Sequence, residues 1–393
     1  MPSVCCYFQM HQPMRLRRYS VFDTNPDYFD AELNRSVLDK VAGKCYIPAT
    51  KAISDLVKKH DGEFRVSFGV TGVLLTQLRA HAPEVIDQLA SLAETGHVDF
   101  AAEPYYHSLS FMYSRDEFRE QVEMQAETLE ELFGVKPVVF RNTEMIYNND
   151  LAHFIAGLGK YNGILTEGAD RILEDRSPNV SYSPPHTDGV TLLLRNYRLS
   201  DDIAFRFSNQ DWSEHPLTAE KFAGWIKQID SEGDNRLCNL FMDFETFGEH
   251  QWEQTGIFGF LEQLPRAVLD AGSRFVTLRE GVEAHPPADQ LDVSNMISWA
   301  DTERDLSAWI GNAMQSNAMH ELYKLEDGVK SRGDKQLLED WRLLTVSDHF
   351  YYMCTKYFAD AAVHDYFNPY ESPYDSYINF MNVLDNLRSR VGE

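Results

Sequence analysis

Short apolar runs alternate with longer amphipathic runs over residues 1 to about 280 of the chain. The short runs are rich in β-branched, aromatic and aliphatic residues, which is typical of buried strands. The longer run at 115–134 predicts a helix that ends at Gly134, with an apolar face formed by Phe118, Val122, Met124, Leu129 and Leu132. The predicted strands lie at 4–8, 64–70, 98–103, 137–140, 163–166, 191–196, 237–243 and 274–278.

The repeated order of strand, helix and strand predicts parallel strands joined by right-handed crossovers. About eight such strands over this length favour a closed or nearly closed (β/α) barrel over an open sheet. Paired prolines and polar residues at 283–295 then interrupt regular structure. Helices alone are predicted beyond, at 304–326, 334–362 and 373–390. We therefore expect an α/β barrel of residues 1–285 and a C-terminal α-helical domain of residues 286–393, packed on the barrel and contributing to its cleft.

Composition and charge narrow the classes of partner. The 393 residues are 43% hydrophobic, which suits a globular protein, and the formal net charge is −25. That charge repels phosphate backbones and anionic lipid, so neither nucleic acid nor a membrane is expected as a partner. It suits a neutral ligand such as a sugar, and equally a protein that is only soluble or adapted to salt. No apolar run has the form of a secretory signal or a membrane span.

Cysteine usage bears on the compartment. The five cysteines are odd in number and show no CxxC spacing: Cys5, Cys6, Cys45, Cys238 and Cys354. Buried free thiols and a reducing, cytoplasmic location are the expectation.

Polar residues follow five of the predicted strands. Because the carboxyl ends of parallel barrel strands meet at one rim, we expect an active site there. A single charged strand end would mean little, since helices often begin with such residues. These residues are Gln9, His11 and Gln12 after the first strand, Glu103, Tyr105, Tyr106 and His107 after the third, Arg141, Asn142 and Glu144 after the fourth, Arg195, Asn196, Asp201 and Asp202 after the sixth, and Asp243 at the end of the seventh.

Two carboxylates on such a rim suit cleavage of a glycosidic bond, and Glu144 and Asp243 form the natural pair. Glu245 shares the alternation of Asp243, and it either tunes that acid or caps a following helix. Aromatic side chains are candidates to stack on sugar faces, although each one alone is more often part of a core. They are Tyr105, Tyr106, Trp212, Trp252 and Trp299.

Five segments in order resemble the sequence regions of glycoside hydrolase family 57, which contains α-amylase-type enzymes and 4-α-glucanotransferases. They are "HQP" near the start, "GHVDFAAEPYYHSLS", "FRNTEMIYNND", "MDFETFGEH" and "SWADTERDLSAWIGN" at 298–312. The resemblance spans residues 11 to about 312. No single motif is specific, but their order and spacing are.

The resemblance implies an incomplete (β/α)7 barrel followed by a helical bundle, and retaining cleavage or transfer at α-glucosidic bonds of starch, glycogen or maltodextrin, without a metal or another cofactor. Glu144 matches the family's nucleophile and Asp243 its general acid/base. His11 and His107 match positions that line the sugar subsite. Seven strands imply that either the fifth or the last predicted strand lies outside the barrel. Further candidates for substrate binding are Gln12, Glu103, Tyr106, Arg141, Arg195, Asp201, Glu245, His250, Trp252, Trp299 and Asp301.

Several functions remain open from the residues. Hydrolysis of α-1,4-glucans is favoured over branching, because the chain is compact and its fifth region differs from the branching-enzyme form. A 4-α-glucanotransferase would share every step up to the covalent intermediate. A noncatalytic glucan-binding protein would not need the two acids. A metal-dependent polysaccharide deacetylase would need an Asp with an HxxxH pair, and the sequence has no such pair.

Overall fold

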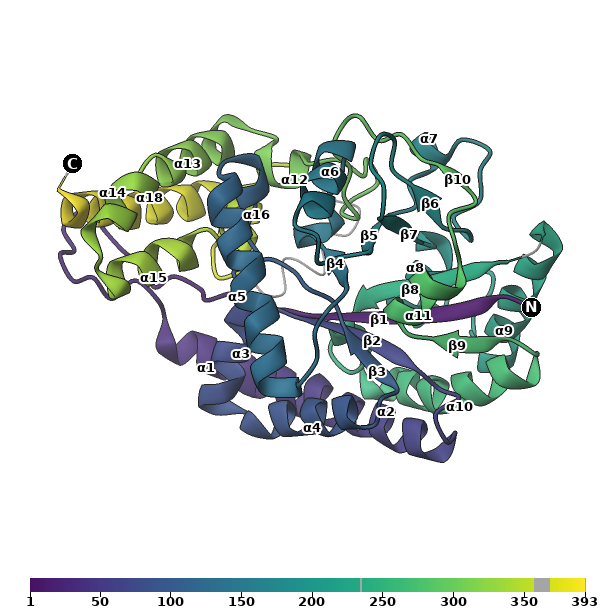
Figure 1. The fold of residues 1–393 in the computed structure, drawn as a ribbon. Helices are drawn as coiled ribbons and strands as arrows, with labels where there is room; N and C mark the ends of the chain where they lie inside the picture. Colours follow the sequence, from purple (N-terminus) through teal and green to yellow (C-terminus); the bar gives the residue numbers. More distant parts are fainter. Residues whose placement is uncertain (234, 357–367, 393) are drawn as a thin grey trace.

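Two five-stranded sheets form the centre of the protein, described by a computed structural model for residues 1–233, 235–356 and 368–392 (Figure 1). In the first sheet the strand order is β3-β2-β1-β8, and β9 also pairs with β1. All of these pairings are parallel. The strands are β1 (Ser3–Met10), β2 (Val66–Val70), β3 (Val98–Phe100), β8 (Leu237–Asp243) and β9 (Arg274–Val276).

The second sheet has the order β10-β6-β7-β5-β4, in which β4, β5 and β7 are parallel. Contacts at both of its sides join it to the first sheet. Ala102, just after β3, forms a parallel bridge with Phe140 of β4. At the other side, Asn239 of β8 donates its side-chain amide to the Leu194 carbonyl at 2.9 Å. Seven parallel strands therefore follow one another around a ring. The strands are β4 (Val139–Arg141), β5 (Gly163–Glu167), β6 (Tyr182–Ser183), β7 (Thr191–Arg195) and β10 (Asp289–Gln290).

Strand alternation explains why the ring strands are mostly apolar. On β1, Val4, Cys6 and Phe8 pack against the surrounding helices. Cys5 and Tyr7 point the other way and pack with residues of both sheets inside the ring. Because successive side chains of a strand face opposite sides, a strand covered on both faces is apolar at most of its positions.

Helices follow most strands and cover the ring from outside (Figure 1). A short π-helix, η1 (Ala42–Tyr46), joins the first two. The helices are α1 (Ala31–Val41), α2 (Ile47–Lys59), α3 (Gly72–His81), α4 (Pro83–Glu94), α5 (Arg115–Phe133), α6 (Asn149–Gly157), α7 (Asp170–Leu173), α8 (Tyr197–Ala204), α9 (Ala219–Gln228), α10 (Ile257–Asp270) and α11 (Leu278–Ala284).

A group of helices near the C-terminus packs beside the ring, with α5 at the junction (Figure 1). Their core includes Trp309, Trp341 and Phe380. Arg342 donates to both carboxylate oxygens of the buried Glu117 on α5, at 2.8 and 3.0 Å, and so ties the two parts together. These helices are α12 (Ser307–Ile310), α13 (Ala313–Tyr323), α14 (Glu326–Arg332), α15 (Lys335–Leu344), α16 (Ser347–Tyr351) and α18 (Pro373–Val391).

The predicted elements agree with this architecture in class and mostly in position. The α/β fold and the helical C-terminal region are confirmed. Helix α5 ends as expected at Gly134, whose φ of 66° is in the left-handed region that glycine favours. Of the two strands in doubt, the last is the one outside the ring, since β9 pairs only with the first residues of β1.

Three details of the prediction differ from the structure. The two-residue strands β6 and β10 are too short to give a sequence pattern. Helix 304–326 begins only at Ser307 and is interrupted, with α14 starting at its end. Helix 334–362 breaks between α15 and α16, and its residues 357–362 lie outside the described part of the chain.

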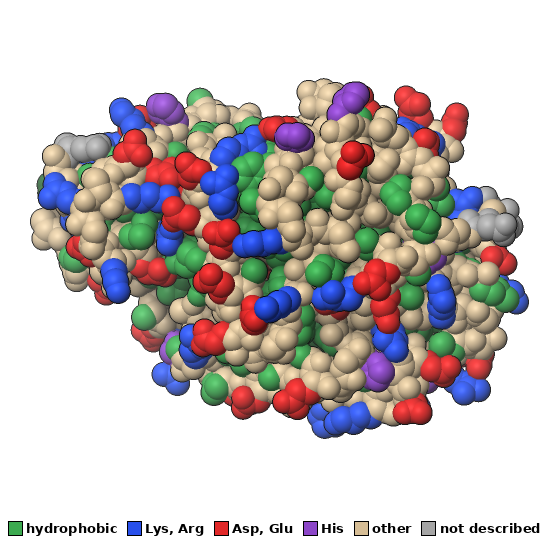
Figure 2. Space-filling view, viewed as in Figure 1, with side chains coloured by type: hydrophobic (Ala, Val, Ile, Leu, Met, Phe, Trp, Pro, Cys, Tyr) green, Lys and Arg blue, Asp and Glu red, His purple; other side chains and the backbone are tan. Residues whose placement is uncertain are grey.

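The surface carries both signs of charge. On the face in Figure 2, acidic and basic side chains are interspersed and do not form a large patch of one sign. All five cysteines are free and buried. None of the helices among the described residues is long and apolar enough to cross a membrane.

Candidate active site

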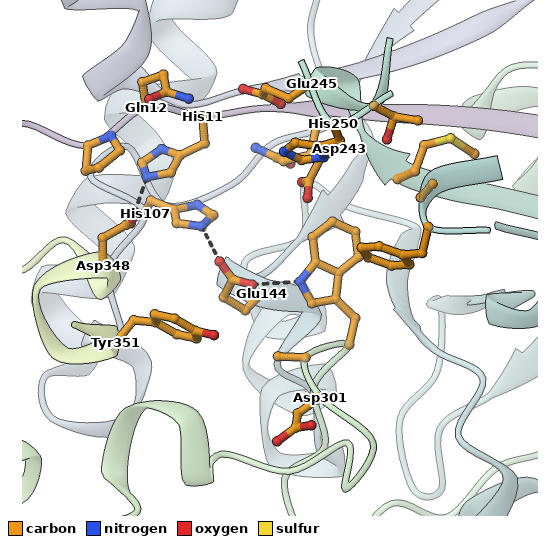
Figure 3. A pocket seen from close by; sticks show the side chains of 18 of the residues that line it. His11, Gln12, His107, Glu144, Asp243, Glu245, His250, Asp301, Asp348 and Tyr351 are labelled. Carbon is orange, nitrogen blue, oxygen red and sulfur yellow. Dashed lines mark hydrogen bonds and ion pairs between the residues drawn. The ribbon is translucent and has the colours of Figure 1, made fainter. Parts of the chain in front are cut away.

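A cavity of about 160 Å³ opens at the carboxyl ends of the ring strands. Side chains from β1, β4, β7 and β8 and from the loops that follow them point into it (Figure 3). The C-terminal helices close one side, because Asp348 and Tyr351 of α16 also line it. The rim predicted from the strand ends is therefore a real concave site.

Glu144 is held in place by two direct hydrogen bonds. Its side chain accepts from a ring nitrogen of His107 at 3.0 Å and from the indole N–H of Trp299 at 2.6 Å (Figure 3). Burial opposes ionisation, but these bonds and the positive charges of His107 and Arg141 lower the pKa of Glu144 to about 2. The residue has a φ of 55°, which is rare for a side chain other than glycine. Such backbone conformations concentrate at functional sites.

His107 lies between two carboxylates. Its second ring nitrogen is 3.6 Å from Glu103, which is fully buried beneath it. Although burial disfavours the charged ring, the two acids raise the pKa of His107 to about 9. His107 is therefore a cation at neutral pH, and it supplies both a proton donor and a positive charge to Glu144.

His11 connects this group to the C-terminal helices. Its ring stacks on that of His107, with 4.0 Å between the ring centroids. One nitrogen lies 2.9 Å from the Thr71 hydroxyl and the other 3.0 Å from the Asp348 carboxylate. Burial and the charge of His107 lower the pKa of His11, while Asp348 opposes that change. The orientation of His11 thus depends on a residue of α16.

Asp243 ends β8 on the other side of the cavity (Figure 3). Burial, followed by the negative charge of Glu144, raises its pKa, against the charges of Arg141, Arg195 and His107. Glu245 lies two residues further and accepts a hydrogen bond from Tyr46 of the π-helix η1. Burial and the charge of Asp243 raise the pKa of Glu245 as well. Both interpretations of Glu245, the tuning of Asp243 and the capping of a helix, stay predictions.

Arg141 is fully buried and lies between the acids. Its guanidinium stacks 4.8 Å from the Trp299 ring centroid, and its nearest carboxylate oxygen, on Glu103, is 3.8 Å away. None of its three side-chain nitrogens has a hydrogen-bond partner among the described residues. Strand β4 ends at Arg141, so strand alternation does not separate it from Glu144. Its donors are available to a ligand in the cavity.

A second ion-pair network fixes the opposite wall. Arg195 donates to Glu167 at 3.1 Å and to Asp201 at 2.5 Å, and Arg304 lies 3.7 and 3.5 Å from the same two acids. Arg304 and Asp301, with φ values of 51° and 57°, belong to the loop that carries Trp299. The network therefore holds this loop, and with it the Trp299 indole, against the ring.

Twelve of the fifteen residues predicted for the site line the cavity. They are Glu144, Asp243, His11, Gln12, His107, Arg141, Arg195, Asp201, Glu245, His250, Trp299 and Asp301. Trp299 was expected to stack on sugar, yet its N–H is bound to Glu144.

Three residues that were predicted to bind the substrate do not line the cavity. Glu103 is buried below the cavity and accepts from Gln9 at 3.1 and 3.0 Å. Tyr106 faces the C-terminal helices and donates to Glu339 at 2.6 Å, because it lies in a turn in which the His107 N–H donates to the Pro104 carbonyl. Trp252 is 57% exposed and lines a separate hollow.

Several cavity residues were not predicted from the sequence. Asp348 sits in the first turn of α16, where an acid is the usual neighbour of a helix N-terminus, so nothing in its local pattern signals a site. Arg304 lies at the start of the helix predicted at 304–326, where a charged residue is ordinary and does not indicate a site. Arg15, Tyr351 and Tyr352 also line the cavity without having been predicted. Gln9 lines it too, as its place on the predicted rim indicates.

Comparison with known proteins identifies the class of enzyme to which this rim belongs. The Glycosyl hydrolase family 57 model matches residues 5–294. The chain is thus a glycoside hydrolase of family 57, as its five segments indicate.

Individual relatives agree with that assignment. A protein named "Putative alpha-amylase" from Methanocaldococcus jannaschii is 41% identical over 401 residues, covering 98% of this chain and 84% of the relative. The solved GH57 branching enzyme of Thermococcus kodakaraensis superposes with a TM-score of 0.71 at 14% identity, over 93% of this chain and 87% of that one. The alpha-amylase AmyC of Thermotoga maritima gives 0.60 at 13% identity, over 99% and 94%. At these identities the two structures show a shared fold alone.

Proposed function

We propose that the protein is a retaining glycoside hydrolase that cleaves α-1,4-glucosidic bonds of starch, glycogen or maltodextrin. Glu144 is the nucleophile and Asp243 the general acid/base. The observation that carries the proposal is the opposite displacement of their pKa values, lowered for Glu144 and raised for Asp243. Retaining cleavage needs one ionised and one protonated carboxyl group at the same bond.

In the first step an oxygen of Glu144 attacks the anomeric carbon, and the bond to the leaving oxygen breaks. Asp243 gives its proton to that oxygen, which leaves a glycosyl–Glu144 ester. In the second step Asp243, now a carboxylate, takes a proton from water as the water attacks the same carbon. Glu144 departs as a carboxylate and Asp243 is protonated again. If a sugar hydroxyl replaces the water, the product is a transferred glucan.

The walls of the cavity support a sugar ligand. The unpaired donors of Arg141 can bind hydroxyl groups, and such a ligand would satisfy buried polar atoms that otherwise lack a partner. His11 and His107 form a stacked pair next to Glu144, where the ring under attack would lie. No charged group of the ligand is needed for these contacts, which suits a neutral glucan.

We also propose that the seven ring strands form the family's incomplete (β/α)7 barrel, with the C-terminal helices as a second domain. In this proposal the boundary between the two domains lies later than the predicted one between residues 285 and 286. Leu291, Val293 and Ile297 pack in the same cluster as Phe140 and Ile164 of the ring strands. Residues up to about 297 therefore belong with the barrel. The free state of all five cysteines supports a reducing, cytoplasmic location.

The test is incubation of the wild type, Glu144→Gln and Asp243→Asn with maltoheptaose, following reducing ends and product lengths together. New reducing ends from the wild type alone support a hydrolase that uses this acid pair. Redistributed chain lengths at a constant number of reducing ends identify a 4-α-glucanotransferase. If the wild type leaves the sugar unchanged, the catalytic proposal is wrong.

A further inference from the structure

A second hollow, of about 630 Å³, lies outside the catalytic cavity. It is bounded by η1 and α2 on one side and by α10 on the other, and the segment 248–254 forms its edge. Trp252 stands in this segment with 57% of its surface exposed, and the half-buried Phe258 lies beside it in the wall. Trp252 is the single tryptophan among the exposed large apolar side chains of the described residues.

The segment that carries Trp252 is firmly held. The backbone N–H of Gly248 donates to the Gln251 carbonyl at 2.9 Å, and the Gln251 side chain donates to the Ala204 carbonyl at 2.8 Å. Gly248, with a φ of 112°, lets the chain approach η1, because a Cβ there would stand 2.0 Å from the Lys44 carbonyl oxygen. Lys40 pairs with the buried Glu249 at 3.0 Å. The indole is therefore presented by rigid backbone, and little order would be lost on binding.

The chemistry of the lining selects the kind of ligand. The hollow contains two lysines against three acids, so it is nearly neutral and gives no attraction to a polyanion. Its wall is rich in donors and acceptors at the ends of long side chains, among them Lys51, Asp55, Gln254 and Glu262. A flat aromatic face surrounded by polar groups suits a neutral, hydroxyl-rich ring.

We propose that this hollow is a second glucan-binding site, at which Trp252 stacks on a sugar ring of a polymer that is also bound at the catalytic cavity. This inference rests on the proposed function for the identity of the polymer. The two sites share one segment of the chain. Asp243, Glu245 and His250 line the catalytic cavity, and Trp252, two residues after His250, lines the hollow. A site of this kind would retain a long chain between cleavages and would matter less for a short oligosaccharide.

The first experiment measures binding of glycogen by native affinity electrophoresis, in the Glu144→Gln background so that the polymer is not consumed. Trp252→Ala is expected to raise the apparent Kd at least about fivefold, and Trp252→Phe, which keeps a ring, to recover part of that loss. Tyr374→Ala is the matched control, because Tyr374 is 62% exposed on α18, away from the hollow. Equal binding by Trp252→Ala and the control would overturn the proposal.

The second experiment compares kcat/KM on glycogen with kcat/KM on maltoheptaose in proteins that retain Glu144. The ratio is expected to fall at least about fivefold in Trp252→Ala and to stay unchanged in Tyr374→Ala. An equal loss on both substrates would assign Trp252 to the catalytic cleft, and a change in oligomeric mass on light scattering would assign the hollow to a contact between copies. Either result overturns the inference. If the wild type cleaves neither substrate, the proposed function fails, while the electrophoresis still decides whether the hollow binds glucan.

Discussion

Glu144 and Asp243 face one cavity, and largely the same cations act on both, yet their pKa values move in opposite directions. The charges of His107 and Arg141 favour the ionised form of each carboxyl group. Glu144 additionally accepts hydrogen bonds from His107 and from Trp299. For Asp243 none of the main influences is a hydrogen bond, and burial together with the charge of Glu144 outweighs the cations.

For this pair of acids the difference lies in the direct donors: Glu144 accepts two hydrogen bonds, and nearby positive charge alone does not lower the pKa of Asp243. A donor within about 3 Å stabilises the carboxylate without further desolvation, whereas a cation at a distance must overcome the cost of burial. The ionisation of Glu144 in turn keeps the proton on Asp243. The assignment of the two roles therefore follows from where the N–H groups point.

The largest effect is expected from removal of Glu144, which accepts the hydrogen bonds from His107 and Trp299. Glu144→Ala is expected to lower kcat on maltoheptaose by at least about 10³-fold, because no covalent intermediate forms. Added azide should enter the vacated space and attack the anomeric carbon of an activated α-glucoside directly. We expect NMR to identify a β-glucosyl azide. An α-glucosyl azide from this variant would contradict the assignment of Glu144 as nucleophile.

Removal of Asp243 tests the other role, that of the general acid/base. Asp243→Ala is expected to lower kcat on maltoheptaose by about 10²- to 10⁴-fold, with a smaller loss on an activated aryl glucoside that needs no proton. Here azide should attack the glycosyl–Glu144 ester and give the α-glucosyl azide. In the wild type, activity should decline as the pH rises through the raised pKa of Asp243, since its protonated form is required. A decline that persists unchanged in Asp243→Ala would assign it to another group.

His107→Gln is a weaker perturbation, because it removes the positive charge next to Glu144 and puts a side chain of similar volume in place of the histidine ring. His107→Gln should raise the pKa of Glu144 above about 2, because the cation and its hydrogen bond are the main influences that lower it. Since Glu144 acts as a carboxylate, the variant should lose activity as the pH falls through that higher pKa, whereas the wild type stays active further into acid. We expect about a 10- to 100-fold loss at the optimum.

Trp299→Phe is the matched variant for His107→Gln, because it removes a neutral donor and no charge. The acid side of its pH–activity profile should shift less than that of His107→Gln. If both profiles match the wild type on the acid side, the direct donors do not set the state of Glu144, and the comparison between the two acids fails.

The smallest effect is expected at Asp348, whose carboxylate bonds to His11 and not to Glu144 or Asp243. Asp348→Asn should raise KM by about 2- to 10-fold and change kcat less, because His11 loses the partner that orients it next to the bound sugar. Asp385→Asn, on the exposed side of α18, is the control. A change confined to the melting temperature would make Asp348 a residue of the domain interface only.

Parts of the site could be predicted because their position in the chain fixes their position in space. Arg141, Arg195 and Asp243 end parallel strands and His11 follows one, and the ends of such strands meet wherever the ring is closed. The same argument located Glu144, although not its left-handed backbone, which depends on the contacts that surround it. The ring itself followed from the repeated order of strands and helices.

Other parts had no local signal. Asp348 comes near the cavity only because α16 packs beside it, and its sequence context is that of any acidic helix start. Trp252 and Tyr106 were placed in the cleft by residue type, whereas their directions depend on the turns at 248–251 and 104–107. Contacts between distant segments and side-chain directions within loops are tertiary properties, so residue type and spacing alone do not define them.

The bond between His11 and Asp348 also has a consequence for the order in which the protein is made. During synthesis the N-terminal region emerges first, and domains generally fold in that order. His11, His107, Glu144 and Asp243 are all present before α16 leaves the ribosome. The ring at that stage holds both acids but lacks the partner of His11 and the wall formed by Tyr351 and Tyr352. A nascent chain would thus complete its cavity only when its last helices dock.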